Sequence, residues 1–353
     1  MLLMAKKASS KRAGDAGRGG KSQARPQAQG HIDVVTGATS GLGIALVKAL
    51  LDMGDEVRVI IIEHPSTSED WKQLPPRVIP YIADLTLKRQ SDYKNMVDAC
   101  RGADRLFHLA ASTHRFGKQT LDDFIAGNVV GTENVLKACV EANPGGEVRF
   151  VYASTIGVYG SKRKGEVLTE ESDTSPKSPY TESKLMGEQV VKSFAEVNST
   201  IKYTIARIAT IYGPGYEESF FRVLRRIRDG TLPNIGKGLN HLALVHVNDV
   251  VRGLVLMASR PEAVSKVYNL SGGDATTLAS MLEISARALG VRPPSGSVRP
   301  VLARFTVKGL ASGEIDFLLS DRIISIDKIK RDLGFKPQMG VNEGVGEMVS
   351  MLK

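Results

Sequence analysis

The stretch Thr36-Gly37-Ala38-Thr39-Ser40-Gly41-Leu42-Gly43 lies between an apolar run, residues 32–35, and a segment with apolar residues at helical spacing. This order predicts a strand, a tight turn and a helix, and residues 57–62 predict the next strand of a βαβ unit. Glycines in such a turn let backbone N–H groups and a helix N-terminus approach a pyrophosphate. The stretch therefore predicts a dinucleotide site that includes Gly37, Ser40, Gly41, Leu42 and Gly43.

A second stretch, Ser178-Pro179-Tyr180-Thr181-Glu182-Ser183-Lys184, carries a candidate proton-transfer pair. On a helix, Tyr180 and Lys184 lie on one face. The Lys184 ammonium is expected to lower the pKa of the Tyr180 phenol from its usual value of about 10. Since tyrosine and lysine four residues apart occur by chance in many chains, the glycine turn is what makes this pair a candidate catalytic pair.

Further landmarks follow in a fixed order: Asp84-Leu85, His108-Leu109-Ala110-Ala111, Asn128-Val129-Val130-Gly131-Thr132, Ala153-Ser154-Thr155 before Val158-Tyr159-Gly160, Arg207 before Tyr212-Gly213-Pro214, and His246-Val247-Asn248-Asp249. With these motifs, residues 32–353 resemble the extended branch of the short-chain dehydrogenase/reductase superfamily, which includes NAD-dependent epimerases, dehydratases and 3β-hydroxysteroid-dehydrogenase-like enzymes. The turn has the spacing TGxxxGxG instead of the TGxxGxxG usual in that branch, which predicts a slightly different phosphate loop.

The resemblance implies catalytic roles for Thr155, Tyr180 and Lys184. Tyr180 would exchange a proton with the substrate hydroxyl while hydride moves to or from the nicotinamide. Lys184 would also hold the nicotinamide ribose. Thr155 would hydrogen-bond the reacting oxygen, with Ser154 as the alternative residue for this role.

The resemblance also implies the cofactor contacts. Asp84 would meet the adenine, and Asn128 would support the active site. An acid that binds the adenosine ribose is expected about 20 residues beyond the turn, and Glu63 lies at that distance, which favours NAD over NADP. The strand-end register instead places Ile61 or Ile62 there, so a solvated Glu63 is the alternative. The remaining expected cofactor residues are Leu85, Leu109, Ala110 and Ala111.

The expected substrate is a small molecule. Nucleotide-sugar enzymes of this family carry an arginine where this chain has Leu242, which favours oxidoreduction of an uncharged secondary alcohol or ketone. The alternative is a nucleotide-sugar epimerase or dehydratase that acts through a transient ketone, its diphosphate bound by Arg222, Arg225 and Arg226. A second alternative is a non-catalytic dinucleotide sensor. The candidate substrate residues are His114, Thr155 and Thr210.

Alternating strand and helix patterns predict an α/β fold with a doubly wound parallel (Rossmann) sheet. Residues 31–210 and 242–272 are expected to form the dinucleotide-binding domain. The resemblance implies that residues 211–241 and 273–353 form a smaller C-terminal substrate domain. It also implies a homodimer formed through the helices that contain residues 134–142 and 183–194.

Charge and composition narrow the possible partners and location. The chain has 353 residues and a net charge of +9, but residues 1–30 hold seven basic residues and one acid, leaving 40 basic and 37 acidic residues elsewhere. This nearly balanced remainder argues against a nucleic-acid partner, and the basic tail is expected to be disordered. No integral membrane segment is expected. Cys100 and Cys139 are expected to be reduced thiols, no metal is expected, and the location is expected to be cytoplasmic, with organelle targeting by the tail left open.

Overall fold

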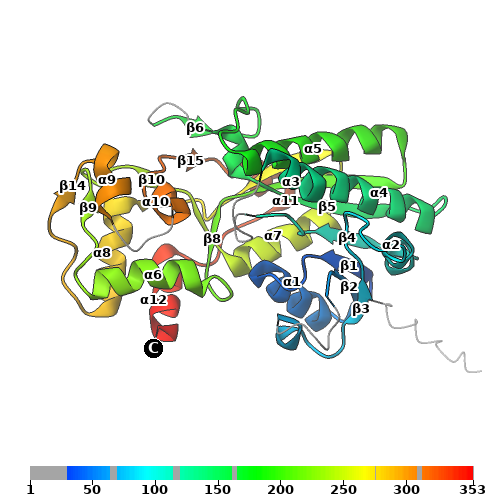
Figure 1. The fold of residues 1–353 in the computed structure, drawn as a ribbon, viewed down its shortest axis with the longest axis horizontal. Coiled ribbons are helices and arrows are strands. Elements are labelled where there is room, and N and C mark those ends of the chain that lie inside the picture. The colour runs from blue at the N-terminus through cyan, green and yellow to red at the C-terminus, as the bar shows by residue number, and fades with distance from the viewer. Residues whose placement is uncertain are drawn as a thin grey trace, which may run out of the picture.

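The computed structural model describes residues 30–63, 70–113, 120–160, 165–274, 276–307 and 312–352. Its centre is a seven-stranded parallel sheet in the order β12-β7-β5-β4-β1-β2-β3 (Figure 1). The order reverses between β1 and β4, as in doubly wound folds, so the predicted α/β class is confirmed. The strands are β1 (Ile32–Thr36), β2 (Glu56–Ile61), β3 (Ile79–Ile82), β4 (Arg105–His108), β5 (Val148–Thr155), β7 (Ile201–Ile208) and β12 (Lys266–Leu270).

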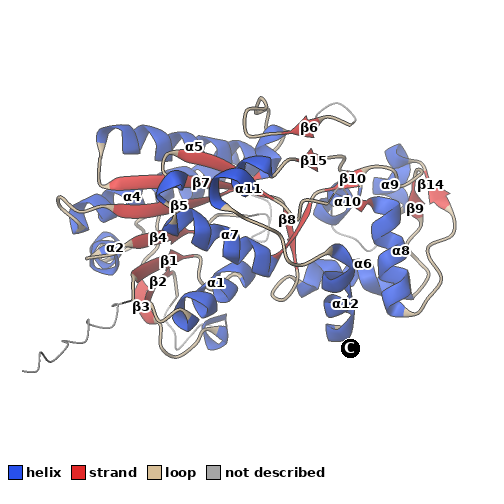
Figure 2. Cartoon of the chain, turned by 180° about the vertical axis from the view of Figure 1, so that it is seen from behind, coloured by secondary structure: helices blue, strands red, loops and turns tan. Residues whose placement is uncertain are grey.

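Helices cover both faces of this sheet, as Figures 1 and 2 show from opposite sides. On one face, α1 (Gly41–Asp52), α7 (Val247–Ser259) and α11 (Asp327–Leu333) bury residues such as Leu46 and Leu254. The other face is covered by α2 (Asp92–Cys100), α4 (Gly131–Ala142) and α5 (Pro179–Val197). The apolar residues of α1 recur at helical spacing because a single side of the helix is buried.

A third apolar cluster lies beside the sheet, at the left of Figure 1. Residues from α6 (Glu217–Arg228), α8 (Leu278–Leu289) and α12 (Val341–Met351) form most of it. Two shorter helices, α9 (Pro300–Thr306) and α10 (Ser312–Leu318), complete this group. The separate cluster shows that these helices pack on one another.

Four pairs of short strands lie outside the large sheet in the described residues. The pairs are β6 (Val167–Leu168) with β15 (Ile323–Ile324), β8 (Thr210–Tyr212) with β11 (Leu244–His246), β9 (Asn234–Ile235) with β14 (Ser297–Val298), and β10 (His241–Leu242) with β13 (Thr276–Thr277). Single turns are η1 (Asp70–Gln73), η4 (Ile156–Tyr159) and η5 (Pro261–Ala263), and α3 (Leu121–Ile125) continues through a π-helical turn, η3 (Ala126–Val130), into α4.

The parallel sheet sets the position of the candidate site. Because β5, β4 and β1 are neighbours, their final residues, Thr155, His108 and Thr36, end at the same edge. Ligands of doubly wound sheets bind outside this carboxyl edge, near the point where the strand order reverses. Within the described ranges, no helix combines the length and apolar character needed to cross a membrane.

Candidate active site

The glycine turn between β1 and α1 is built for close backbone approach. Gly37 has a φ of 70°, and a Cβ there would lie 2.6 Å from the Ala110 nitrogen. A Cβ on Gly43 would lie 2.3 Å from the Gly37 carbonyl oxygen. Ser40 caps α1, since its hydroxyl donates to the Gly37 carbonyl (2.8 Å) and accepts from the Gly43 N–H (3.1 Å). Only glycine fits at both crowded positions, which suits a turn that must accept a pyrophosphate.

The unusual spacing of this turn has a structural consequence. Ser40, not a glycine, stands at the N-cap, and Gly41 begins the helix. A Cβ on Gly41 would lie 2.4 Å from the Gly215 carbonyl oxygen, so the segment after β8 packs directly on the turn. The Leu42 side chain is buried in the core, which leaves its backbone as the part that can contact a cofactor.

Strand β4 is tied to the glycine turn by His108. One ring nitrogen lies 2.8 Å from Thr36 Oγ1 and the other 3.0 Å from Thr132 Oγ1, and the Ala110 N–H donates to Thr36 Oγ1 (3.2 Å). Burial, with a smaller contribution from Lys184, lowers the pKa of His108 to about 3, so the ring is neutral. This bonding holds the following residues beside the turn, partly buried: Leu109, Ala110 and Ala111.

Asn128 connects three segments around the site. Its side chain accepts from the Ser112 N–H (2.6 Å) and donates to the Ser112 carbonyl (3.2 Å) and to Ser183 Oγ (2.9 Å). Ser183 lies on α5, so Asn128 joins the loop after β4 to the helix that carries Tyr180 and Lys184. This position is compatible with the supporting role expected of Asn128.

Tyr180 and Lys184 lie in the first turns of α5, whose start is fixed by a capping box between Ser178 and Thr181. Tyr180 is partly buried and packs edge-on against Phe124, with ring centroids 6.0 Å apart. Lys184 is 2 % exposed, and its Nζ lies 4.2 Å from the centroid of the Tyr152 ring. The capped helix thus presents both residues at the carboxyl edge of the sheet.

The expected depression of the Tyr180 pKa by Lys184 is wrong. Burial raises the pKa of Tyr180 to about 12. Burial also lowers the pKa of Lys184 to about 7, against an opposing effect of Glu188. The ammonium lies over the Tyr152 ring, and desolvation penalises the charged form of both groups.

The two adjacent hydroxyls at the end of β5 have different environments. Ser154 is buried and donates a 2.5 Å hydrogen bond to Glu188 Oε1. Thr155 is partly exposed, and its Oγ1 accepts from the Gly157 N–H (3.1 Å). A Cβ on Gly157 would lie 2.6 Å from Thr181 Cγ2, so this segment packs against the first turn of α5. The contacts favour Thr155 over Ser154 as the residue that can meet a substrate.

Glu188 and Arg207 form a buried ion pair that sequence analysis missed. The Arg207 guanidinium donates to Glu188 from Nε (3.0 Å) and Nη2 (2.8 Å) and lies 4.9 Å from the Tyr159 ring centroid. Glu188 lies one helical turn beyond Lys184, and this spacing is the signal that could have identified it. The two opposite charges compensate each other inside the protein.

Asp84 and Leu85 form a fixed turn after β3. The Asp84 carboxylate accepts from Thr86 N–H (2.8 Å) and Oγ1 (2.7 Å). Burial acts to raise the Asp84 pKa, but the bonds from Thr86 and Lys88 outweigh it and lower the pKa overall. The Leu85 carbonyl accepts from Asn134 Nδ2 (2.8 Å). An ionised Asp84 is therefore held at the edge of the sheet.

Three predicted residues lie at the margin of this arrangement. Glu63 is exposed and lies two residues beyond the end of β2. Thr210 is exposed on β8, and its N–H donates to the Ala243 carbonyl (3.1 Å). His114 lies outside the described residues.

The described side chains include no group of three or more His, Cys, Asp or Glu residues arranged to hold a metal ion. Cys100 and Cys139 are buried free thiols whose sulfur atoms lie 3.4 Å apart. The hydrogen bond with Cys100, together with burial, raises the pKa of Cys139, which disfavours the reactive thiolate form.

Comparison with known proteins identifies the family. The profile of the NAD dependent epimerase/dehydratase family matches residues 34–271, which include the glycine turn, Thr155, Tyr180 and Lys184. The chain belongs to this family. The predicted enzyme class and the prediction of NAD as cofactor are thereby confirmed.

The chain is also similar to individual proteins whose names describe different activities. A dTDP-glucose 4,6-dehydratase from Streptomyces griseus is 32% identical over 256 residues, covering 70% of this chain and 71% of that protein. A 2-alkyl-3-oxoalkanoate reductase from Stenotrophomonas maltophilia is 25% identical over 337 residues, 88% of this chain and 96% of its own. The solved structure of MoeE5 in complex with UDP-glucuronic acid and NAD has a TM-score of 0.70 and 27% identity, covering 90% of this chain and 97% of that one.

Proposed function

We propose that this enzyme acts on a nucleoside-diphosphate sugar by oxidising one carbinol to a transient ketone. The observation that carries the proposal is the similarity over most of the chain to proteins named for dTDP-glucose or solved with UDP-glucuronic acid and NAD. Thr155, Tyr180 and Lys184 at the carboxyl edge support the redox step. Bound NAD would accept the hydride from the carbinol carbon and return it.

The presence of Leu242 in place of an arginine no longer favours an uncharged substrate. Leu242 is fully buried in the apolar cluster with Leu278 and Met281. A side chain inside that cluster does not select between a diphosphate and an apolar ligand. Oxidoreduction of a simple alcohol or ketone stays as the second candidate function, supported by the similarity to a 2-alkyl-3-oxoalkanoate reductase.

Side chains of this protein transfer the proton and orient the substrate and the cofactor. Because Thr155 Oγ1 accepts from the Gly157 N–H, its own hydrogen is available to the reacting oxygen of the substrate. Tyr180 must be deprotonated to accept the carbinol proton when hydride leaves, and it then returns this proton to the ketone. Burial raises the pKa of Tyr180 to about 12, which opposes the first step, and the positive charge of bound oxidised NAD would act in the opposite direction. Lys184 holds the nicotinamide ribose, and Asn128 holds α5 in place through its bond to Ser183.

Among sugar reactions, we infer epimerisation in preference to dehydration. Loss of water next to a ketone needs a further base and an acid for the departing hydroxyl. The buried titratable groups described near Thr155 and Tyr180 are engaged: Glu188 with Ser154 and Arg207, and His108 with two threonines. Epimerisation returns the hydride to the same carbon, so it needs neither the further base nor the further acid.

Product analysis tests the proposal. The enzyme should be incubated with NAD and, separately, UDP-glucose, UDP-glucuronic acid and dTDP-glucose, and the sugars examined by NMR. We expect inversion at one carbon of at least one sugar without net NADH. A keto-deoxy sugar would indicate dehydration instead. No conversion of any nucleotide sugar, together with NADH formation from apolar secondary alcohols, would establish the second candidate.

We further propose that residues 211–241 and 273–353 bind the substrate, since their helices share an apolar cluster of their own beside the carboxyl edge. We also propose that the protein forms a homodimer through the helices that contain residues 134–142 and 183–194. Its proposed location is the cytoplasm. The free thiols of Cys100 and Cys139 support a reducing compartment. Light scattering at micromolar concentration tests the dimer.

A further inference from the structure

Lys184 is a buried lysine whose ammonium group faces an aromatic ring. Its residue is 2 % exposed, and within the described part of the chain its Nζ forms neither a hydrogen bond nor an ion pair. Glu188 acts on it through its charge, but the Glu188 carboxylate is bonded to Ser154 and Arg207. The ammonium lies 4.2 Å from the centroid of the Tyr152 ring. An aromatic face attracts a cation, and the attraction is stronger where water is excluded.

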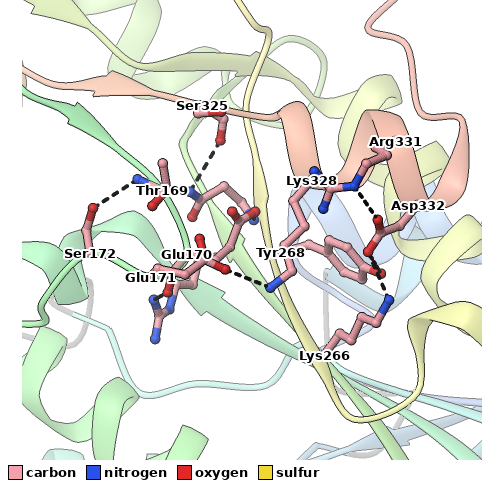
Figure 3. Close-up of polar contacts among 12 residues, drawn as sticks. Thr169, Glu170, Glu171, Ser172, Lys266, Tyr268, Ser325, Lys328, Arg331 and Asp332 are labelled. Atoms are coloured by element: carbon pink, nitrogen blue, oxygen red, sulfur yellow. Dashed lines mark hydrogen bonds and ion pairs between the residues drawn. The ribbon is translucent and has the colours of Figure 1, made fainter.

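Lys328, drawn in Figure 3, has a contrasting arrangement. Its Nζ lies 3.4 Å from the Glu171 carboxylate and 5.8 Å from the centroid of the Tyr268 ring. That ammonium therefore has a carboxylate partner and a more distant ring. Lys184 has a closer ring and no bonded carboxylate, so the position of its charge depends on Tyr152.

The close approach of α5 to β5 depends on Gly187. A Cβ at this position would clash with Tyr152 Oη and would lie 2.9 Å from Tyr152 Cζ. The Tyr152 hydroxyl lies 3.5 Å from the Lys184 carbonyl oxygen. Gly187 follows Lys184 by three residues, so the two are neighbours on the helix surface. The position that admits the ring thus lies beside the lysine that faces it.

Tyr152 is itself held firmly. It is fully buried on β5, and its ring stacks on His108, with 5.8 Å between centroids and 24° between planes. His108 is in turn bonded to Thr36 and Thr132. Burial raises the pKa of Tyr152 well above its usual value, so the phenol is neutral. What Tyr152 offers to Lys184 is therefore the face of its ring.

We propose that Tyr152 is a positioning residue whose ring face holds the Lys184 ammonium in the place from which it donates to the nicotinamide ribose. This inference rests on the role proposed for Lys184. It gives Tyr152 and Tyr180 different tasks, because Tyr180 exchanges a proton at its hydroxyl whereas Tyr152 acts through its ring. The aromatic face at position 152 is therefore required, and the hydroxyl is not.

Binding of NADH from about pH 6 to 9, followed by the fluorescence of NADH, tests the inference. NADH is suitable because its nicotinamide carries no charge. Donation to the ribose needs the ammonium form, and the ligand-free protein loses this proton as pH rises through the Lys184 pKa of about 7. NADH affinity should therefore fall above pH 7 in wild type.

Tyr152→Leu should lower NADH affinity about 2- to 30-fold at about pH 8. It should also move the midpoint of the pH dependence about one pH unit lower, because the ammonium loses the ring that stabilises it. Tyr152→Phe should resemble wild type. A trifluorinated phenylalanine at position 152 keeps the shape of the Phe variant but weakens the negative face of the ring, so it should move the midpoint downward even if Tyr152→Leu fails to fold.

The other titratable groups around Lys184 do not obscure this measurement. The pKa is about 3 for His108 and about 12 for Tyr180, and that of Tyr152 is raised. Glu188, the neighbouring carboxylate on α5, is held in its buried ion pair. Lys184→Met should abolish the pH dependence of NADH binding, which identifies Lys184 as the group that titrates.

Phe150→Leu is the matched control, since Phe150 is fully buried on the same strand and in the same apolar cluster as Tyr152. It should lower the melting temperature about as much as Tyr152→Leu does and leave the pH midpoint unchanged. Equal midpoints in wild type and Tyr152→Leu, or equal changes in the two Leu variants, would overturn the role of Tyr152. A loss in Tyr152→Phe as large as in Tyr152→Leu would assign the effect to the hydroxyl and would also overturn it.

The outcomes separate this inference from the proposed function. If NADH binding responds as expected but no nucleotide sugar is converted, the proposed function fails and the role of Tyr152 stands. If Lys184→Met keeps the wild-type pH dependence, the inference fails even where a nucleotide sugar is converted.

Discussion

The Ser154 hydroxyl donates a 2.5 Å hydrogen bond to Glu188, which joins the end of β5 to α5 one turn beyond Lys184. Arg207 on β7 binds the same carboxylate. Thr155 is the neighbour of Ser154, so this buried group sets the position of Thr155 relative to the helix that carries Tyr180. Glu188 is thus a positioning residue, and it also acts on Lys184 through its charge.

Glu188→Gln should be strongly destabilising, because it leaves the buried Arg207 charge without its partner. The expected loss in the free energy of unfolding is about 3–5 kcal/mol, measured by urea denaturation. Glu196→Gln, an exposed position on the same helix, is the control and should change little. An unchanged free energy in Glu188→Gln would contradict the assigned ion pair.

Tyr180→Phe should lower turnover about 10²- to 10⁴-fold, as expected for loss of a positioned acid–base group. NAD affinity should stay close to wild type because the phenyl ring and its contact with Phe124 remain. Single-turnover kinetics and NAD titration measure the two quantities. Turnover at the wild-type rate would remove Tyr180 from the mechanism.

Thr155→Val and Ser154→Ala form a matched pair at adjacent positions. The first should lower kcat about 10²- to 10³-fold, as for loss of one donor to a developing charge, and cost about 1 kcal/mol of stability because the Gly157 N–H loses its acceptor. The second should instead cost about 1–3 kcal/mol of stability, because Glu188 loses a buried donor. The opposite pattern would assign Ser154, not Thr155, to the substrate.

Lys184 should make stability depend on pH. Its pKa is about 7 in the folded protein and about 10.5 when unfolded, so the unfolded chain binds more protons between these values. Stability should therefore rise from pH 7 toward pH 10.5, whereas below pH 7 the burial penalty is fully present. Urea denaturation across this range should show a smaller rise for Lys184→Met than for wild type. Equal slopes would show that Lys184 is not the group responsible.

Gly37→Ala and Gly145→Ala compare two glycines with positive φ, 70° and 75°. A Cβ at Gly145 meets nothing within 4 Å, whereas one at Gly37 meets the backbone of Ala110. Gly145→Ala should cost about 1–2 kcal/mol from backbone strain alone. Gly37→Ala should cost more and weaken NAD binding. Equal effects in thermal melts and NAD titrations would argue against crowding at the turn.

Local patterns in the sequence were enough to predict the central elements of the fold. The order of strand, glycine turn and helix depends on neighbouring residues, and Gly37 and Gly43 are crowded as the motif predicts. Tyr180 and Lys184 share a helix because Ser178 and Thr181 cap its start. These features follow from contacts between residues close in sequence.

Tertiary packing decided the pKa values and the hydrogen-bond partners of the individual side chains. Desolvation comes from segments far apart in the chain, so the raised pKa of Tyr180 and the lowered pKa of Lys184 could not be predicted from their spacing. The same holds for the different environments of Ser154 and Thr155 and for the burial of Leu242. Sequence by itself determined which elements form and where the cofactor turn lies, whereas tertiary structure decided which side chains are buried, paired or available, because burial and pairing depend on distant segments meeting in space.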